Sequence, residues 1–183
     1  MGWGTTATQG LVARAGDLIG WPVPIAVGAV TVGGAGDEEP SLAASDPALL
    51  NGLFEIGSVT KTITATLLAL AVGDGLLTLH SPIGTWLDAG ANASITVGQL
   101  ATHTSGLPRL APNALDHVGF QHNDPYAAFT QELALQGLRS TDLAETGGEV
   151  YSNFGYQLLG LVLERATSRT YAALLAEEVA GPR

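Results

Sequence analysis

Residues 58–73 constrain the fold of this chain more than any other stretch. Val59, Ile63 and Leu67 recur there at helical spacing, which predicts a helix with one buried face. Threonine at every second position of residues 60–66 would also suit a strand, because β-branched side chains favour sheets. The segment is longer than a typical strand and ends at a glycine, so we interpret it as a helix with a glycine cap.

Two polar side chains at the start of this helix can carry chemistry. Ser58 and Lys61 are three residues apart and therefore project from one face. The backbone N–H groups and positive dipole end of a first helical turn stabilise developing negative charge. In a buried site, desolvation lowers the pKa of a lysine amine, which could then accept the serine proton and make Ser58 a nucleophile. The simpler interpretation is a capping serine followed by a solvated lysine, and the short S-x-x-K spacing alone favours it.

Two later motifs alter that balance. Residues 103–108 read His-Thr-Ser-Gly-Leu-Pro, and residues 151–153 read Tyr-Ser-Asn. Together with S-x-x-K, which lies within Phe-Glu-Ile-Gly-Ser-Val-Thr-Lys at residues 54–61, they resemble the serine β-lactamase-related family. That family includes class C β-lactamases, D-alanyl-D-amino-acid peptidases and esterases. The resemblance implies an α/β (α+β) fold of the β-lactamase/transpeptidase type, of which this chain holds the helical part and the N-terminal strands.

The resemblance also implies a serine hydrolase that forms an acyl-enzyme and needs no cofactor or metal. Ser58 would attack an ester, amide or β-lactam carbonyl, while Lys61 and Tyr151 share its proton. Asn153 would hydrogen-bond the lysine and bind the substrate. Residues 103–108 look structural by the same resemblance, so we assign them no catalytic role.

The family domain extends further than this chain. Relatives continue into strands that carry a third motif, K-T-G or H-x-G, which supplies the second oxyanion donor. We therefore expect residues 1–183 to form one incomplete domain. A second interpretation, favoured by the missing motif, is a non-catalytic remnant or subunit that binds without turnover. Losing one oxyanion donor typically costs about 10²–10³ in rate, so slow acylation is compatible with both interpretations.

Local patterns predict the other elements. Helices are expected over residues 8–20, 82–87, 97–100, 125–137, 154–163 and 170–180. Strands are expected over residues 25–32 and 53–56, with a weak strand within residues 38–51. Thr96 with Gln99 fits a capping box, and Ser81 and Asp124 fit N-cap positions. So few strands would leave an unpaired apolar edge, which predicts self-association.

Two patterns that would indicate bound ligands fail on spacing. The glycine-rich residues 33–37 form a turn that fits neither a dinucleotide-binding nor a phosphate-binding loop. Asp116, His117 and His122 lack the spacing of metal ligands, so we interpret them as solvated loop residues.

Composition excludes further classes of partner. Lys and Arg total 7 against 17 for Asp and Glu, a net charge of −10 without a basic cluster, which argues against nucleic acid and anionic membranes. The absence of cysteine excludes disulfides, thiolate metal sites and a cysteine nucleophile. No apolar run approaches the length of a membrane-spanning helix. The N-terminus shows no secretory signal, so we expect a cytoplasmic protein by default, or one that has lost its leader.

Overall fold

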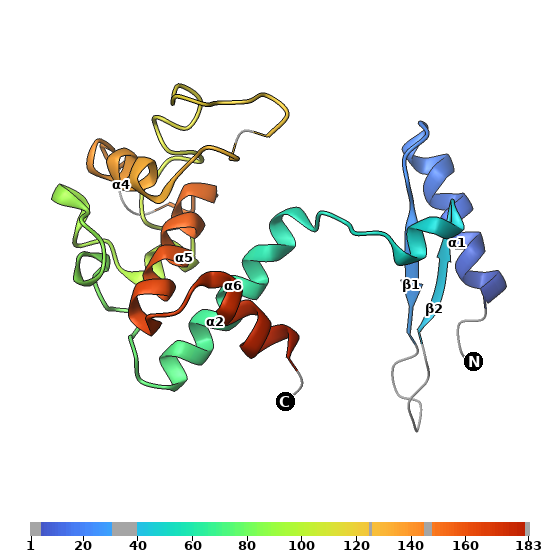
Figure 1. The fold of residues 1–183 in the computed structure, drawn as a ribbon, viewed down its shortest axis with the longest axis horizontal. Coiled ribbons are helices and arrows are strands. Elements are labelled where there is room, and N and C mark those ends of the chain that lie inside the picture. The colour runs from blue at the N-terminus through green and yellow to red at the C-terminus, as the bar shows by residue number, and fades with distance from the viewer. Residues whose placement is uncertain (1–4, 31–39, 125, 145–147, 182–183) are drawn as a thin grey trace. The chain divides into compact units, whose positions relative to one another are not determined.

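The chain folds as two units, Met1–Ile56 and Gly57–Arg183 (Figure 1). The computed structural model describes residues 5–30, 40–124, 126–144 and 148–181. The S-x-x-K, His-Thr-Ser-Gly-Leu-Pro and Tyr-Ser-Asn motifs all lie in the second unit. The second unit is therefore the one that positions the candidate site.

The first unit is a helix packed on a two-stranded sheet. Helix α1 (Thr5–Ile19) contacts β1 (Ala26–Ala29) and β2 (Ser41–Ala44), which are antiparallel, with Ala26 opposite Ala44. The predicted helix and first strand are confirmed, and β2 is the weak strand expected within residues 38–51. The predicted continuation of β1 beyond residue 30 and the turn at residues 33–37 lie outside the described residues.

The strand predicted for residues 53–56 is wrong. This run has no regular secondary structure, and Leu53 is fully exposed. A short apolar run becomes a strand only where a neighbour completes its backbone hydrogen bonds. In the described ranges the sheet contains β1 and β2 only, so residues 53–56 have no strand partner. Self-association through a sheet edge stays a prediction.

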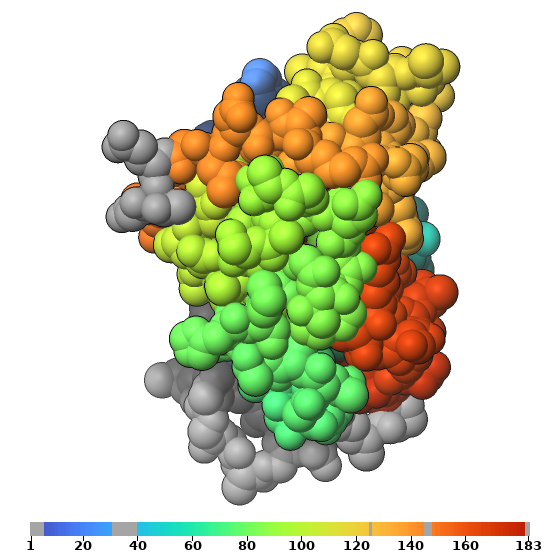
Figure 2. Space-filling model, turned by 90° about the vertical axis from the view of Figure 1, so that its left-hand side faces the viewer, coloured from blue at the N-terminus to red at the C-terminus, as the bar shows by residue number. Residues whose placement is uncertain are grey.

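The second unit is helical and is arranged around α5. Its helices are α2 (Thr60–Gly73), α3 (Val97–Ala101), α4 (Gln131–Arg139), α5 (Asn153–Thr167) and α6 (Tyr171–Leu175), which continues as a π turn, Ala176–Ala180. Helix α5 packs against α2, α3, α4 and α6. The chain between α2 and α4, coloured green to yellow, forms much of the face seen in Figure 2.

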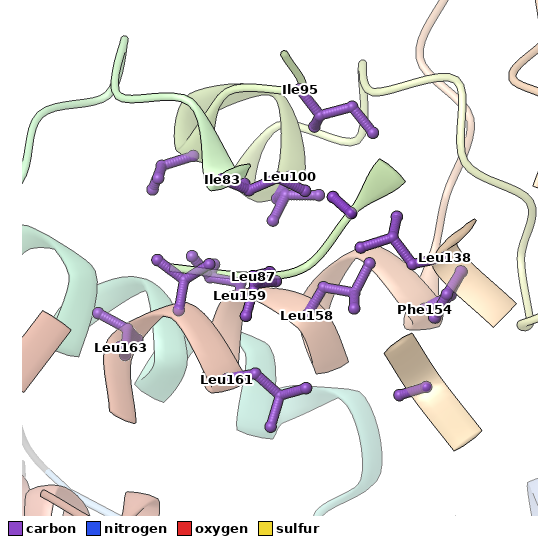
Figure 3. Close-up of a cluster of buried hydrophobic side chains, with 14 of the residues drawn as sticks. Ile83, Leu87, Ile95, Leu100, Leu138, Phe154, Leu158, Leu159, Leu161 and Leu163 are labelled. Atoms are coloured by element: carbon purple, nitrogen blue, oxygen red, sulfur yellow. The ribbon is translucent and has the colours of Figure 1, made fainter. Parts of the chain in front are cut away.

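The core of the second unit lies on both sides of α5. In Figure 3, Leu158 and Leu159 of α5 lie against Leu87 and Leu100. All four side chains are buried, and burial of each contributes roughly 1.5–3 kcal/mol. The same packing also buries Phe154 in the first turn of α5. The start of α5, which carries the Tyr-Ser-Asn motif, is thereby anchored in the core.

Two predicted helix starts are wrong, and in neither case does the predicted residue cap the element. The helix expected from residue 125 begins at Gln131, where the Thr130 hydroxyl accepts a hydrogen bond from the Leu133 N–H at 3.3 Å. The helix expected over residues 82–87 is only a short turn, Ile83–Thr85. Ser81 Oγ accepts from the Thr78 N–H at 3.0 Å and does not cap that turn. Elsewhere the capping box at Thr96 is confirmed.

The interpretation of His117 as a solvated residue is also wrong. Its ring is buried against Phe120 and Phe129, with centroids 6.0 and 5.3 Å away. Among the described residues, no group of three or more His, Cys, Asp or Glu side chains could hold a metal ion. Within the same ranges, every helix is too short or too polar to span a membrane.

Candidate active site

Ser58 lies just before α2 and not inside it. It occupies a short helical turn, Gly57–Val59, and α2 begins at Thr60, so the predicted helix start at Ser58 is wrong by two residues. Gly57 has φ +52°, a conformation that glycine adopts at little cost. No side chain caps the start of α2, where Val59 is the N-cap residue. The simpler interpretation, a capping Ser58, is therefore wrong.

The buried face of α2 differs from the predicted one. Its buried residues are Thr64, Leu67, Leu68 and Ala71, whereas Val59 is 58% exposed. Because α2 starts after Val59, the first apolar residue of the predicted stripe falls outside the helix. Lys61, in the first turn of α2, is only partly covered.

The structure brings together the four residues that the sequence nominated. The Tyr151 phenol donates a hydrogen bond to Ser58 Oγ at 2.6 Å, and Lys61 Nζ donates to the same oxygen at 3.2 Å. Lys61 Nζ also donates to Asn153 Oδ1 at 2.7 Å. Residues more than ninety positions apart thus form one connected set of hydrogen bonds. The set joins a serine hydroxyl to two groups that can exchange protons, a lysine amine and a phenol.

The start of α5 fixes Tyr151 and Asn153. Ser152 is buried, and its Oγ caps α5 by accepting from the Gly155 N–H at 2.8 Å. The same hydroxyl donates to the Pro108 carbonyl at 2.7 Å. The Arg109 carbonyl accepts the Asn153 N–H at 3.0 Å. Residues 108 and 109 therefore hold the Tyr-Ser-Asn motif by its backbone and its middle side chain.

Two cationic side chains lie close to the Tyr151 ring. Lys61 Nζ lies 4.8 Å from its centroid, and the Arg109 guanidinium carbon lies 5.3 Å from it. The Lys61 ammonium, followed by the hydrogen bond with Ser58, lowers the pKa of Tyr151 below its ordinary value. Cations stabilise the phenolate, so this phenol can lose its proton more readily than a solvated tyrosine.

Two of the residues at the site are accessible to solvent. Ser58 is exposed, and Tyr151 is 39% exposed. Hollows of about 590 and 670 Å³ both include Ser58 and Lys61 in their walls. The larger one is otherwise mostly apolar, with walls that include Leu110, Ala114 and Phe129.

Two aromatic residues lie at the site beside the four nominated ones: His103, interpreted from the sequence as structural, and Tyr156, which the sequence did not single out. The His103 ring contacts the Tyr151 and Tyr156 rings, with centroids 4.6 and 5.1 Å away. Tyr156 also lies beside the Lys61 ammonium, 5.6 Å from the ring centroid to Nζ. Tyr156 follows Asn153 by three residues on a helix, and that spacing could have placed it on the same face. The orientation of His103 depends on a positive φ, which spacing does not indicate.

Comparison with known proteins identifies the class. The family model for Beta-lactamase matches residues 25–183, so the chain belongs to the Beta-lactamase family. The D-alanyl-D-alanine-carboxypeptidase/endopeptidase AmpH of Escherichia coli (strain K12) is 30% identical over 141 residues, covering 73% of this chain and 35% of AmpH. Esterase EstB of Burkholderia gladioli is 32% identical over 142 residues, covering 71% of this chain and 36% of EstB.

The fold comparison agrees with that assignment. A class C β-lactamase structure aligns with a TM-score of 0.70 at 24% identity, over 96% of this chain and 48% of that one. The predicted fold class, a partial β-lactamase/transpeptidase-like domain, is confirmed. The chain spans about a third of the length of the two curated relatives named above.

Proposed function

We propose that this chain carries the acylation site of a serine hydrolase and that Ser58 is its nucleophile. The observation that supports this most directly is the pair of hydrogen bonds to Ser58 Oγ, from Tyr151 at 2.6 Å and from Lys61 at 3.2 Å. A serine hydroxyl is a weak nucleophile until a neighbouring base accepts its proton. The family's other hydrolases support the same class of reaction.

Tyr151 is the proposed general base. In its phenolate form it accepts the Ser58 proton while Ser58 Oγ bonds to the substrate carbonyl carbon, and the carbonyl π electrons move to oxygen. When the tetrahedral intermediate collapses, the bond to the leaving group breaks and Tyr151 returns the proton to that group. Water then attacks the acyl-enzyme by the same route in reverse, releasing the acid and free Ser58.

Lys61 and Asn153 keep this proton transfer favourable. The Lys61 ammonium stabilises the Tyr151 phenolate, and Asn153 Oδ1 holds that ammonium at 2.7 Å. The Ser58 N–H lies beside the uncapped start of α2, where the positive end of the helix dipole favours an oxyanion. The Asn153 amide is also close enough to the larger hollow to contact a bound substrate.

A second candidate is a protein that binds or is acylated without turnover. The openness of the site favours it, because an exposed Ser58 leaves water to compete with the groups that stabilise charge. The two candidates share acylation of Ser58 and differ in the rate at which the acyl group leaves. Both are compatible with an ester, amide or β-lactam substrate.

An activated ester tests this proposal. Incubation with p-nitrophenyl acetate should add one acetyl group to the intact mass of the wild-type protein, and the change Ser58→Ala should abolish the adduct. The matched control Ser94→Ala, at an exposed serine outside the site, should be acylated like wild type. Decay of the adduct with steady release of nitrophenol identifies a hydrolase, and a persistent adduct identifies acylation without turnover. An adduct on Ser58→Ala would refute the proposed nucleophile.

A further inference from the structure

His103 contacts the segment before α5 on both sides of Tyr151. Its backbone carbonyl accepts the Val150 N–H at 2.9 Å. Its ring atom Nδ1 accepts the Ser152 N–H at 3.1 Å. One residue thus holds the backbone immediately before and immediately after the phenol that reaches Ser58.

The backbone conformation of His103 makes this double contact possible. Its φ is +60°, in the left-handed region that few residues other than glycine adopt. Such a conformation costs free energy and persists where the surrounding contacts require it. Here it directs the carbonyl and the ring toward the same segment. The ring also contacts the Tyr151 ring at an interplanar angle of 36° and the Tyr156 ring at 41°.

The hydrogen bond from Ser152 defines the protonation of the ring. An acceptor Nδ1 must carry a lone pair, so the neutral ring holds its proton on Nε2. Burial, followed by the charge of Lys61, lowers the pKa of His103 below its ordinary 6.5, and Glu149 opposes the shift. Protonation of Nδ1 would set one N–H against another and break the bond to Ser152.

We propose that neutral His103 is a positioning residue that holds Tyr151 in reach of Ser58. The inference rests on the proposed role of Tyr151 as general base. The groups that face the ring are Lys61 from α2, Tyr156 from α5, and Glu149 and Tyr151 from the segment before α5. Protonated His103 releases the Ser152 N–H and adds a positive charge beside Lys61, so the proton-transfer geometry is lost at low pH.

Two substitutions of His103 distinguish the contribution of its hydrogen-bond acceptor, Nδ1, from that of its aromatic ring. Asparagine tolerates positive φ, and its Oδ1 can replace Nδ1 as acceptor, so His103→Asn keeps the hydrogen bond and removes the titration. His103→Phe keeps an aromatic ring and removes the acceptor. The exposed His80 supplies the matched control, His80→Phe.

The measurement is the rate of Ser58 acylation by p-nitrophenyl acetate across the pH range. We expect His103→Phe to slow acylation about tenfold or more, because the Ser152 N–H loses its acceptor, and His103→Asn to slow it less. In the Tyr151→Phe background, His103→Phe should cause no further loss. Below the His103 pKa, the slope of log rate against pH should steepen from about one to about two in wild type, and stay about one in His103→Asn.

The outcomes separate this inference from the proposed function. If Tyr151→Phe slows acylation but His103→Phe does not, the inference fails and the proposed function stands. If His103→Phe does not fold, as judged by circular dichroism, the slopes of wild type and His103→Asn decide, and equal slopes overturn the inference. If wild type is not acylated at all, the proposed function fails. The ¹⁵N shifts of the His103 ring still test the contact, and a proton on Nδ1 at neutral pH would overturn it.

Discussion

The starts of α2 and α5 face each other across the site, and they are built in opposite ways. At α5, Ser152 is buried and its hydroxyl makes hydrogen bonds of 2.8 Å to Gly155 and 2.7 Å to Pro108. At α2, no side chain caps the helix. Ser58 is exposed there, and the hydrogen bonds of its hydroxyl are to Tyr151 and Lys61. Two serines at similar positions thus have different surroundings.

Under the proposed function, the start of α5 is structural and the start of α2 is chemical. A buried serine that uses both its proton and a lone pair on the backbone is not available for attack on a substrate. A serine before an uncapped helix keeps its hydroxyl accessible and lies near N–H groups that favour negative charge. The anchored start of α5 presents Tyr151 and Asn153 to the open start of α2. We therefore expect Ser→Ala at the start of α5 to lower stability, and Ser→Ala at the start of α2 to abolish acylation.

The largest expected effect is that of Tyr151→Phe on acylation. Loss of a general acid-base group slows a reaction by about 10²–10⁴, while the phenylalanine ring keeps the contact with His103. Thermal unfolding should therefore change little. Stopped-flow acylation with an activated ester checks the rate, and calorimetry checks the stability. Acylation of the variant at the wild-type rate would make Tyr151 a structural residue.

The pH dependence of acylation sharpens the role of Tyr151. Because the pKa of Tyr151 is lowered, its phenolate is favoured in the fold, and the rate should rise with pH and level off below the ordinary 10.0. Below the pKa of Tyr151 in the folded protein, the rate should rise about tenfold per pH unit. Tyr151→Phe should lose this dependence, as rates measured in matched buffers will show. A wild-type rate independent of pH between neutrality and the alkaline limit would contradict the assignment.

Ser152→Ala should break the anchored start of α5. The change removes a helix cap and the partners of the buried Gly155 N–H and the partly buried Pro108 carbonyl, which should lower the free energy of unfolding by about 1–3 kcal/mol. Ser58→Ala should change stability by less than about 0.5 kcal/mol, because Ser58 is exposed and caps nothing. Urea unfolding of the two variants provides the comparison. Equal destabilisation would show that the two starts do not differ as described.

A smaller effect than that of Ser152→Ala is expected for the coupling between the two starts. Lys61 Nζ and Asn153 Oδ1 join them at 2.7 Å in a partly solvated position. A double-mutant cycle with Lys61→Met and Asn153→Ala should give an interaction energy of roughly 0.5–1.5 kcal/mol in stability. The pair Lys61 and Asn113, whose side chains have no hydrogen bond between them in the described residues, serves as a control cycle with an expected value near zero. An interaction energy of zero for Lys61 and Asn153 would show that their hydrogen bond does not couple the two helix starts.

Local signals predicted the elements whose ends are determined by neighbouring residues. The capping box at Thr96 and the helix that follows Ser152 were predictable because the capping groups lie three residues from their partners. The strand at residues 53–56 was not, since a strand requires a partner elsewhere in the chain. The start of the helix at Gln131 was also predicted wrongly, because its cap is Thr130 and not Asp124.

The candidate site was predictable as a set of residues and not as a geometry. The S-x-x-K spacing placed Ser58 near Lys61, and the resemblance added Tyr151 and Asn153. The 2.6 Å contact between Tyr151 and Ser58 depends on the packing of α5 against α2, which local sequence does not determine. The place of His103 depends on a left-handed backbone, for which a histidine gives no sequence signal.

The most direct test of the account is the identity of the serine that a fluorophosphonate labels. The protein is incubated with the probe, digested, and the adduct is mapped by mass spectrometry. We predict one adduct, on Ser58, which disappears in Ser58→Ala, while the buried Ser105 and Ser152 remain unmodified. Labelling of Ser105 or Ser152, or undiminished labelling of Ser58→Ala, would contradict the claim that the open start of α2 carries the nucleophile.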